Sequence, residues 1–281
     1  MTTIIDGRKI SKEIIEEVKK EISSLPFQPV FCDVLVGNDP ASVQYVNMKA
    51  KKTENVGIKF HRAEFPKTIS AEKLTEEIRK ISEVPNICGI IIQIPLPKNF
   101  DKKVILNSVD TSLDVDCLGK FASKNFYENN NPVGFPTALA CMVILDSIKL
   151  DLTNKKIVVL GQGDLVGKPV THLLRSRKLS VDVITSKTKN KEKLLKKADV
   201  IISSIGKGKY ITGDMIKKGV VIIDAGTSES TGSIVGDVDL ESVKNIASFV
   251  SPVPGGVGPV TVAILLQNVL KVAKNLKNKQ K

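Results

Sequence analysis

The stretch KKIVVLGQGDLVGKP, residues 155–169, joins an apolar run to a glycine-rich turn. The apolar run predicts a buried strand, and the residues from Gly167 onward predict a helix. A strand that leads through such a turn into a helix is typical of a phosphate-binding loop, because the first N–H groups of a helix attract anions. Gly161 and Gly163 would let a phosphate approach the backbone. Glycines near strand ends also make ordinary turns, so this motif alone does not distinguish a phosphate-binding loop from a structural turn.

Strands and helices alternate on both sides of this stretch. Before it, the apolar patterns predict helices at 11–23, from 40 onward, at 69–82 and at 137–150, and strands at 29–37, 59–66 and 88–97. After it, they predict helices at 167–177, 190–197 and 261–281, and strands at 180–185, 198–206 and 219–226. This alternation predicts parallel sheets with right-handed crossovers.

We therefore expect an α/β protein of two domains. Residues 1–136 form a three-layer α/β domain, and residues 137–259 form a Rossmann-like nucleotide-binding domain. The helix at residues 260–281 returns to pack on the first domain. A length of 281 residues is enough for two domains that each have a core.

Composition excludes several classes of protein. A hydrophobic fraction of 42% and a charged fraction of 26% are those of a soluble globular chain. No apolar stretch reaches the roughly 20 residues of a membrane span, and no secretory leader is visible. Four separated cysteines and two histidines predict neither a metal site nor disulfides, which favours reduced thiols in the cytoplasm.

A net charge of +12 raises the alternative of a nucleic-acid-binding protein. The lysines are dispersed, and only 4% of the residues are aromatic, so stacking side chains do not alternate with basic ones. We favour a solvated basic surface that attracts an anionic small molecule.

Several polar residues of the first half are candidates for a binding site. Tyr45 and Lys49 are four residues apart and share one face of a predicted helix. Gln93 is the only polar residue of its apolar strand, so it is either a satisfied core amide or a pocket group. Asp116 lies in a loop, where most aspartates only make turns. SPVPGGVGPVT, residues 251–261, predicts a stiff loop against which a flat ligand could lie.

The nucleotide type is suggested by the second strand of the predicted Rossmann-like domain. A strand that holds NAD ends in Asp or Glu, which binds the ribose hydroxyls. Here the strand ends in hydroxyl groups and cations, at residues 185–189. These side chains suit a 2′-phosphate, which favours NADP and leaves NAD as the alternative.

Taken together, these segments resemble the bifunctional methylenetetrahydrofolate dehydrogenase/methenyltetrahydrofolate cyclohydrolase family. The similarity extends over nearly the whole chain. It is strongest in VGNDPASVQYVNMKAK (36–51), GIIIQIPLP (89–97), GDMIKKGVVIID (213–224), VGDVD (235–239) and SPVPGGVGPVTVAILLQN (251–268).

The resemblance implies an enzyme, usually a homodimer, that binds folate in a cleft between its two domains. It oxidises 5,10-methylenetetrahydrofolate with NADP and hydrolyses the methenyl product to 10-formyltetrahydrofolate. Lys49 is then the main catalytic residue of the hydrolysis, Tyr45 packs against the folate, Gln93 supports Lys49, and Asp116 bonds the pterin. The implied substrate-binding residues are these four with Ile92, Ile94, Pro254, Gly255, Gly256, Val257, Gly258, Pro259 and Thr261. The implied cofactor-binding residues are Gly161, Gln162, Gly163, Val166, Gly167, Thr185, Ser186, Lys187, Thr188 and Thr227.

The chain departs from the family pattern on the cofactor side. The family usually has Gly-Arg-Ser at the positions of Gly161, Gln162 and Gly163, and a glycine at the position of Cys117. These departures leave a single-activity enzyme as an alternative, either a cyclohydrolase alone or an NAD-dependent dehydrogenase.

Overall fold

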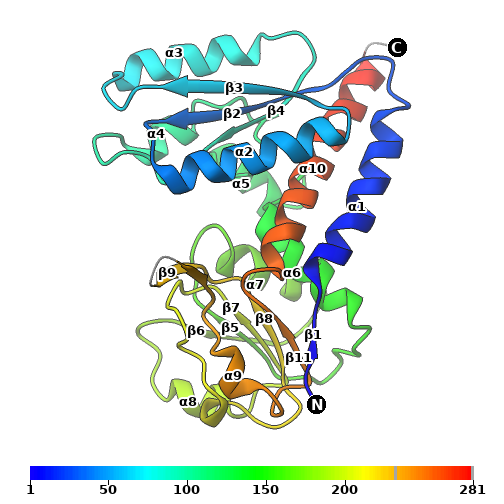
Figure 1. The fold of residues 1–281 in the computed structure, drawn as a ribbon, viewed down its shortest axis with the longest axis vertical. Coiled ribbons are helices and arrows are strands. Elements are labelled where there is room, and N and C mark those ends of the chain that lie inside the picture. Colours follow the sequence, from blue (N-terminus) through cyan, green and yellow to red (C-terminus); the bar gives the residue numbers. More distant parts are fainter. Residues whose placement is uncertain (231–232, 280–281) are drawn as a thin grey trace. The chain divides into compact units, whose positions relative to one another are not determined.

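The computed structural model describes residues 1–230 and 233–279, which fold into two compact units (Figure 1). Unit 1 consists of Met1–Lys12 and Pro136–Thr261, and unit 2 consists of Glu13–Phe135 and Val262–Lys281. The α/β class predicted from the alternation of strands and helices is confirmed in both units.

Unit 2 is built on a three-stranded parallel sheet in the order β3-β2-β4. Its strands are β2 (Val30–Val36), β3 (Lys59–Phe65) and β4 (Ile87–Ile92). Helices α2 (Pro40–Asn55) and α3 (Ala71–Ser82) lie on opposite faces of this sheet (Figure 1). Every residue of the central strand β2 is buried, as expected for a strand that is covered on both faces.

Local sequence signals set where the two flanking helices begin. The Asp39 carboxylate accepts a hydrogen bond from the Ser42 N–H at 2.9 Å, and Pro40 occupies the first helical position of α2. Ser70 caps α3 in the same way through the Lys73 N–H, at 3.2 Å.

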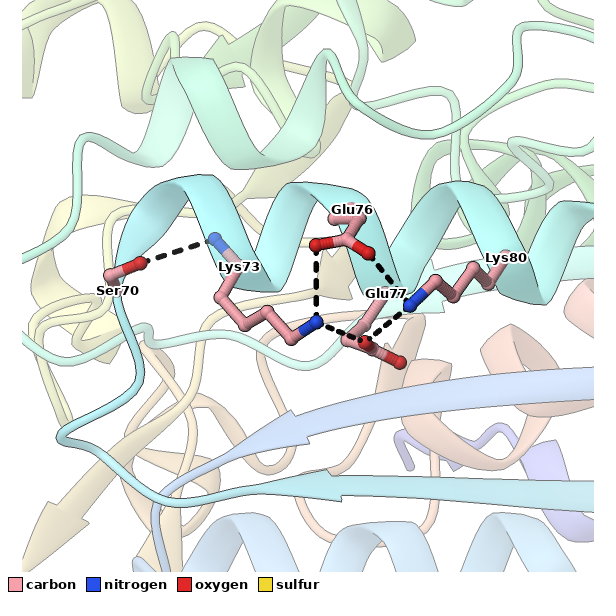
Figure 2. Close-up of polar contacts among 5 residues, drawn as sticks. All are labelled: Ser70, Lys73, Glu76, Glu77 and Lys80. Carbon is pink, nitrogen blue, oxygen red and sulfur yellow. Dashed lines mark hydrogen bonds and ion pairs between the residues drawn. The ribbon is translucent and has the colours of Figure 1, made fainter.

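The exposed face of α3 carries a network of ion pairs (Figure 2). Lys73 bridges Glu76 and Glu77 at 3.1 Å, and Lys80 pairs with the same two carboxylates at 2.7 and 3.0 Å. All four residues lie on the solvated side of the unit, where such pairs are weak.

Unit 1 contains a six-stranded parallel sheet in the order β1-β11-β8-β7-β5-β6. Its strands are β1 (Thr3–Ile4), β5 (Ile157–Leu160), β6 (Val181–Ile184), β7 (Val200–Ser203), β8 (Val221–Asp224) and β11 (Phe249–Ser251). From β5 the chain goes to β6 on one side and then to β7 on the other. This reversal makes the carboxyl end of β5 the switch point at which open α/β sheets bind ligands.

The remaining elements connect or cover these sheets. They are α1 (Gly7–Ile22), α4 (Lys102–Leu106), α5 (Lys120–Tyr127), α6 (Pro136–Ser147), α7 (Gly167–Ser176), α8 (Lys191–Leu195), η1 (Gly213–Met215), β9 (Ser228–Ser230), β10 (Ser233–Val235), α9 (Leu240–Val243) and α10 (Val257–Lys279).

Three features differ from the sequence prediction. The predicted domain 1–136 included the N-terminal segment, but β1 pairs in parallel with β11 and therefore belongs to the sheet of unit 1. Between the strand predicted at 88–97 and the helix predicted at 137–150, the structure contains two further short helices, α4 and α5. The strand predicted at 88–97 ends at Ile92. Gln93 still donates its N–H to the neighbouring strand, and beyond it Pro95 has no N–H with which to continue the ladder.

The last helix, α10, joins the core of unit 2 as predicted. The buried Asn268 donates hydrogen bonds from Nδ2 to the carbonyls of Val115 at 2.9 Å and Gly134 at 2.7 Å. Part of this helix, Val257–Lys277, is long and apolar enough to cross a membrane by length and composition alone. However, 67% of its apolar window is buried inside the protein, which is typical of a core helix.

Two buried carboxylates hold the loops at the carboxyl ends of β7 and β8. Asp237 accepts hydrogen bonds from the Ser203 hydroxyl at 2.6 Å and from the Ile205 and Lys207 N–H groups at 2.8 Å. Asp224 accepts three backbone hydrogen bonds, including one from the Val238 N–H at 2.9 Å. These bonds satisfy loop donors that would otherwise be buried without partners.

Gly236 lies against the Asp224 carboxylate, and a Cβ at this position would overlap it. We expect Gly236→Ala to lower the free energy of unfolding by roughly 3 kcal/mol, since the network cannot move aside without losing hydrogen bonds. Urea denaturation measures this change. Gly163→Ala is the matched control, because its Cβ would enter open space. Equal midpoints for Gly236→Ala and the parent would contradict the tight packing inferred here.

Candidate active site

A buried lysine lies at the centre of the polar residues of unit 2. Lys49 is only 2% exposed, and its Nζ donates a hydrogen bond to Gln93 Oε1 at 2.7 Å. The same Nζ lies 2.5 Å from Oδ2 of Asp33, which is fully buried. The ring of Tyr45 lies below this ammonium group, with 4.9 Å between Nζ and the ring centroid. A charged amine is thus held by two oxygens and an aromatic face.

Three elements of unit 2 supply these side chains. Tyr45 and Lys49 are one turn apart on α2, while Asp33 lies in the middle of the central strand β2. Gln93 directly follows β4, where its N–H bonds the Val34 carbonyl at 2.8 Å and continues the ladder. Its own amide donates to the Ile94 carbonyl at 2.7 Å, which leaves Oε1 to face Lys49. The predicted grouping of Tyr45, Lys49 and Gln93 is therefore present in the structure.

Sequence reasoning missed Asp33. The run 29–37 predicted a buried strand, and its single acidic residue was not singled out. A charged residue within a buried strand is itself a signal, because a carboxylate in an apolar core requires a partner. That partner is Lys49, on a different element.

Asp116 lies near Lys49 and Asp33 because the segment before it runs beside β4. The Ile90 N–H bonds the Leu113 carbonyl at 2.8 Å, and Ile90 and Asp114 form a parallel bridge. Asp114 shapes the following turn by accepting hydrogen bonds from the Asp116 N–H at 3.2 Å and the Gly119 N–H at 2.7 Å.

The carboxyl group of Asp116 is desolvated, although part of the residue is exposed. Desolvation raises its pKa to about 7, while the positive charge of Lys49 acts in the opposite direction. The Asp116 carboxyl can therefore change its charge near neutral pH.

The next residue, Cys117, has a left-handed backbone with a φ of 58°. This conformation favours glycine, the residue that the family usually has at this position. The Cys117 side chain is buried, and its Sγ accepts a weak hydrogen bond from Asn131 Nδ2 at 3.8 Å.

The two apolar residues predicted to line the folate site flank Gln93. Ile92 is buried as the last residue of β4, and Ile94 is partly exposed. Ile94 opens onto a hollow of about 410 Å³ whose other lining residues are Pro95, Leu96, Pro97, Lys98, Phe100 and Lys102.

The predicted glycine-rich folate loop, residues 254–261, lies in unit 1. Pro254 and Gly255, whose φ is 109°, lead into α10, which begins at Val257. The loop is tightened by the Gly256 N–H, which bonds the Pro252 carbonyl at 2.7 Å. Gly258, Pro259 and Thr261 form the first turns of α10. The structure thus divides the predicted folate residues between the two units.

The predicted cofactor loop follows β5 in unit 1. Gly161 has a φ of 100°, and a Cβ on Gly161 or on Gly167 would overlap neighbouring backbone. Gly163 faces open space. Gln162 does not point outward, because its Nε2 donates to Thr171 Oγ1 at 3.0 Å and to the Gly161 carbonyl at 2.8 Å. After Val166, α7 begins at Gly167 without a side-chain cap. The Lys168 N–H bonds the Gly163 carbonyl at 3.1 Å and Pro169 has no N–H, so the Gly167 N–H is the donor that this first turn offers to an anion.

The other predicted cofactor residues follow neighbouring strands of the same sheet. After β6, the Thr188 hydroxyl accepts a hydrogen bond from the Thr185 N–H at 2.9 Å, while Ser186 and Lys187 are exposed. Thr227 is exposed in the segment after β8. Since these segments leave the carboxyl ends of parallel strands, they lie along one edge of the sheet. A turn whose glycines bring the backbone close to a ligand, followed by a helix start without a side-chain cap, fits a dinucleotide phosphate.

Comparison with known protein families gives two matches that together cover most of the chain. Residues 5–116 match the catalytic domain of tetrahydrofolate dehydrogenase/cyclohydrolase. Residues 136–277 match the NAD(P)-binding domain of the same family.

Individual relatives agree with this result over their full length. The bifunctional protein FolD of Nautilia profundicola is 42% identical over 277 residues, which are 97% of this chain and 98% of the relative. The bifunctional FolD methylenetetrahydrofolate dehydrogenase/cyclohydrolase of Campylobacter jejuni superposes with a TM-score of 0.94 at 35% identity, over 98% of this chain and 100% of the other. The Trypanosoma brucei enzyme, solved with NADP and an inhibitor, superposes with a TM-score of 0.92 at 31% identity, over 98% of both chains.

The titration of Asp116 should be visible in the stability of the protein. Its pKa is raised from 3.8 in the unfolded chain to about 7, so the unfolded state loses this proton first. Ionisation of Asp116 therefore makes stability fall as pH rises from about 4 to about 7. Asp116→Asn removes this effect. The free energy of unfolding of the variant minus that of the parent should therefore increase from about pH 4 to about pH 7 and be constant above pH 7. Urea denaturation at pH 5, 6, 7 and 8 measures the difference, and a difference independent of pH would contradict the assignment.

Proposed function

The chain belongs to the tetrahydrofolate dehydrogenase/cyclohydrolase family, and from this premise we propose that Lys49 carries its hydrolytic reaction. The chain is a bifunctional enzyme. It oxidises 5,10-methylenetetrahydrofolate to the methenyl compound with a nicotinamide cofactor and hydrolyses the product to 10-formyltetrahydrofolate. Full-length relatives that are named as bifunctional favour both activities over the single-activity alternative.

The buried Lys49, held by Gln93 and Asp33, is the observation that carries the proposed role. Hydrolysis of the methenyl group requires water to lose a proton while it attacks a cationic carbon. Lys49 Nζ would accept that proton, because the hydrogen bond to Gln93 orients the amine and burial excludes competing water.

The neighbouring residues suit the binding of a flat folate ring. Tyr45 is 37% exposed, so a face of its ring remains available for stacking. The Asp116 carboxylate would accept hydrogen bonds from the pterin N–H groups, and Ile92 and Ile94 would contribute apolar contacts. The Pro254–Thr261 loop would supply backbone groups to the same substrate.

Oxidation depends on the NAD(P)-binding domain of unit 1. A bound nicotinamide would supply the acceptor for the hydride of the folate methylene group. The protein contributes binding: Gly161, Gly163 and the start of α7 would hold the pyrophosphate, and Val166 and Thr227 would flank the dinucleotide.

NADP is the proposed cofactor because of the loop after β6. Ser186, Lys187 and Thr188 offer hydroxyl groups and a cation, and this loop has no carboxylate to repel a 2′-phosphate. Gln162 occupies the position at which the family usually has arginine, and it is bonded to Thr171 instead. Recognition of the 2′-phosphate would therefore depend on the 185–188 loop.

The proposed function also includes the assembly and location that the resemblance implies. We place the enzyme in the cytoplasm as a homodimer that acts on a small folate, with neither nucleic acid nor membrane as a partner. The four cysteines are buried and unpaired, which agrees with a reducing compartment.

Lys49→Met should reduce cyclohydrolase activity at least 100-fold, since methionine keeps the length of the side chain but cannot transfer a proton. Dehydrogenase activity and the circular dichroism spectrum should be retained. The loss of methenyl absorbance and the formation of NADPH measure the two reactions separately. Lys51→Met, an exposed lysine on the same helix, is the matched control. A normal hydrolysis rate in Lys49→Met would remove Lys49 from the mechanism.

Lys187→Glu should shift the cofactor preference from NADP toward NAD. A carboxylate beside the 2′-phosphate should lower the ratio of kcat/KM for NADP to that for NAD by about ten-fold, equivalent to about 1.4 kcal/mol. Steady-state dehydrogenase assays with both cofactors measure this ratio, and Lys196→Glu is the control for a charge change elsewhere in unit 1. If the ratio is the same in Lys187→Glu and the parent, the pocket has been placed wrongly.

A further inference from the structure

We propose that Asp33 is a positioning residue of the hydrolytic reaction, whose carboxylate holds Lys49 and takes up, through Lys49, the proton that the attacking water loses. This inference rests on the proposed role of Lys49. Neither the family resemblance nor the sequence pattern assigns any function to Asp33.

The position of Asp33 is unfavourable for a carboxylate that has only a structural role. It lies at the centre of β2, fully buried, in a strand of which every residue is buried. Apart from the ion pair with Lys49, neither of its oxygens accepts a hydrogen bond from the residues that the structure describes. Replacing a buried ion pair by packed apolar side chains is often neutral or stabilising. A gain in folding stability therefore does not explain why the chain has an ion pair at this position.

The geometry connects Asp33 directly to the reacting end of Lys49. The Nζ group lies 2.5 Å from Asp33 Oδ2 and 2.7 Å from Gln93 Oε1. Gln93 is a neutral amide that cannot take up a proton under these conditions. Of the two oxygen partners of Nζ, only Asp33 can accept a proton from it.

The charged and titratable groups that face Asp33 come from all the elements around it. Lys49 and Tyr45 approach it from α2, Arg62 from β3, and Asp116 from the loop beside β4. Cys32, its neighbour in β2, points to the opposite face of the sheet. Burial raises the pKa of the Asp33 carboxyl, while the charges of Lys49 and Arg62 oppose this shift. A buried carboxylate of this kind accepts a proton more readily than one in water.

The proposed step conserves atoms and charge. The water oxygen forms a bond to the methenyl carbon, and the electron pair of the carbon–nitrogen π bond moves onto nitrogen, which neutralises the substrate cation. The water gives one proton to Lys49 Nζ as Nζ gives one of its own to Asp33 Oδ2. Lys49 remains an ammonium group, and Asp33 becomes a carboxylic acid.

In the second half of the reaction the carbon–N5 bond breaks. The hydroxyl proton of the intermediate moves to N5 as the formyl carbonyl forms on N10. The proton stored on Asp33 then leaves for solvent, which accounts for the one proton that the hydrolysis releases overall.

Asp33→Asn tests the proposal, because the amide has the size of the carboxyl group but cannot take up the proton. We expect the cyclohydrolase kcat at pH 7 to fall at least ten-fold, with dehydrogenase kcat/KM within about three-fold of the parent. The limb of the cyclohydrolase pH–rate profile that reports ionisation of the carboxyl group should disappear. Glu76→Gln, the same change of charge in the exposed network of Figure 2, is the matched control and should change neither rate nor profile.

Asp33→Glu tests rescue and covers the case in which Asp33→Asn does not fold. It keeps a carboxyl group next to Nζ, so the acidic limb of the pH profile should return even if the rate is reduced. An Asp33→Asn variant with the parent rate and profile would overturn the proposal. So would an equal loss of both activities in Asp33→Asn or Asp33→Glu with an unchanged profile, which would show a structural role only.

The Lys49→Met variant separates this proposal from the one on which it rests. If Lys49→Met retains hydrolysis, the role of Lys49 is wrong and the role of Asp33 is overturned with it. If Lys49→Met is inactive in hydrolysis and Asp33→Asn is normal, only the role of Asp33 is overturned.

Discussion

The ion pair between Lys49 and Asp33 is the interaction on which the site in unit 2 depends. Two opposite charges are placed in an apolar core, and each is tolerated only because the other is within contact distance. Gln93 adds the hydrogen bond that fixes the direction of the ammonium group. A shift of α2 against the sheet, or of β4 against β2, would leave a charge buried without a partner. The pair therefore keeps these three elements in register while it holds a reactive amine.

Buried carboxylates also hold neighbouring segments in place in unit 1, where they accept hydrogen bonds from backbone N–H groups. Asp237 accepts the Lys207 N–H after β7, and Asp224 accepts the Gly226 N–H after β8 and the Val238 N–H after β10, so these segments are held without regular secondary structure. Burial raises the pKa of Asp224 to about 7, and its backbone hydrogen bonds oppose that shift. The loop after β5 uses glycine instead at Gly161 and Gly167, where neighbouring backbone leaves no room for a Cβ. Rigid loops at the switch point of a parallel sheet are suited to a dinucleotide.

Much of this organisation could be predicted from sequence, for identifiable reasons. The start of α2 at Pro40 and the cap at Ser70 are local signals that depend on neighbouring residues only. The pairing of Lys49 with Gln93 followed from the family resemblance. Asp33 could not be predicted as the partner of Lys49, because strand and helix meet only in the folded sheet. The strand β1 has two residues and exists only through its pairing with β11, so no periodicity reveals it.

Hydrolysis at the Lys49–Asp33 pair requires the substrate to bind beside Lys49 Nζ. A crystal structure of the enzyme with a folate inhibitor that mimics the methenyl compound would locate the one-carbon bridge. The bridge should lie within hydrogen-bonding reach of Lys49 Nζ, directly or through one water, with the contact between Nζ and Asp33 intact. A bridge bound away from Lys49, or a Lys49 side chain turned out of the contact with Asp33, would contradict hydrolysis at this pair.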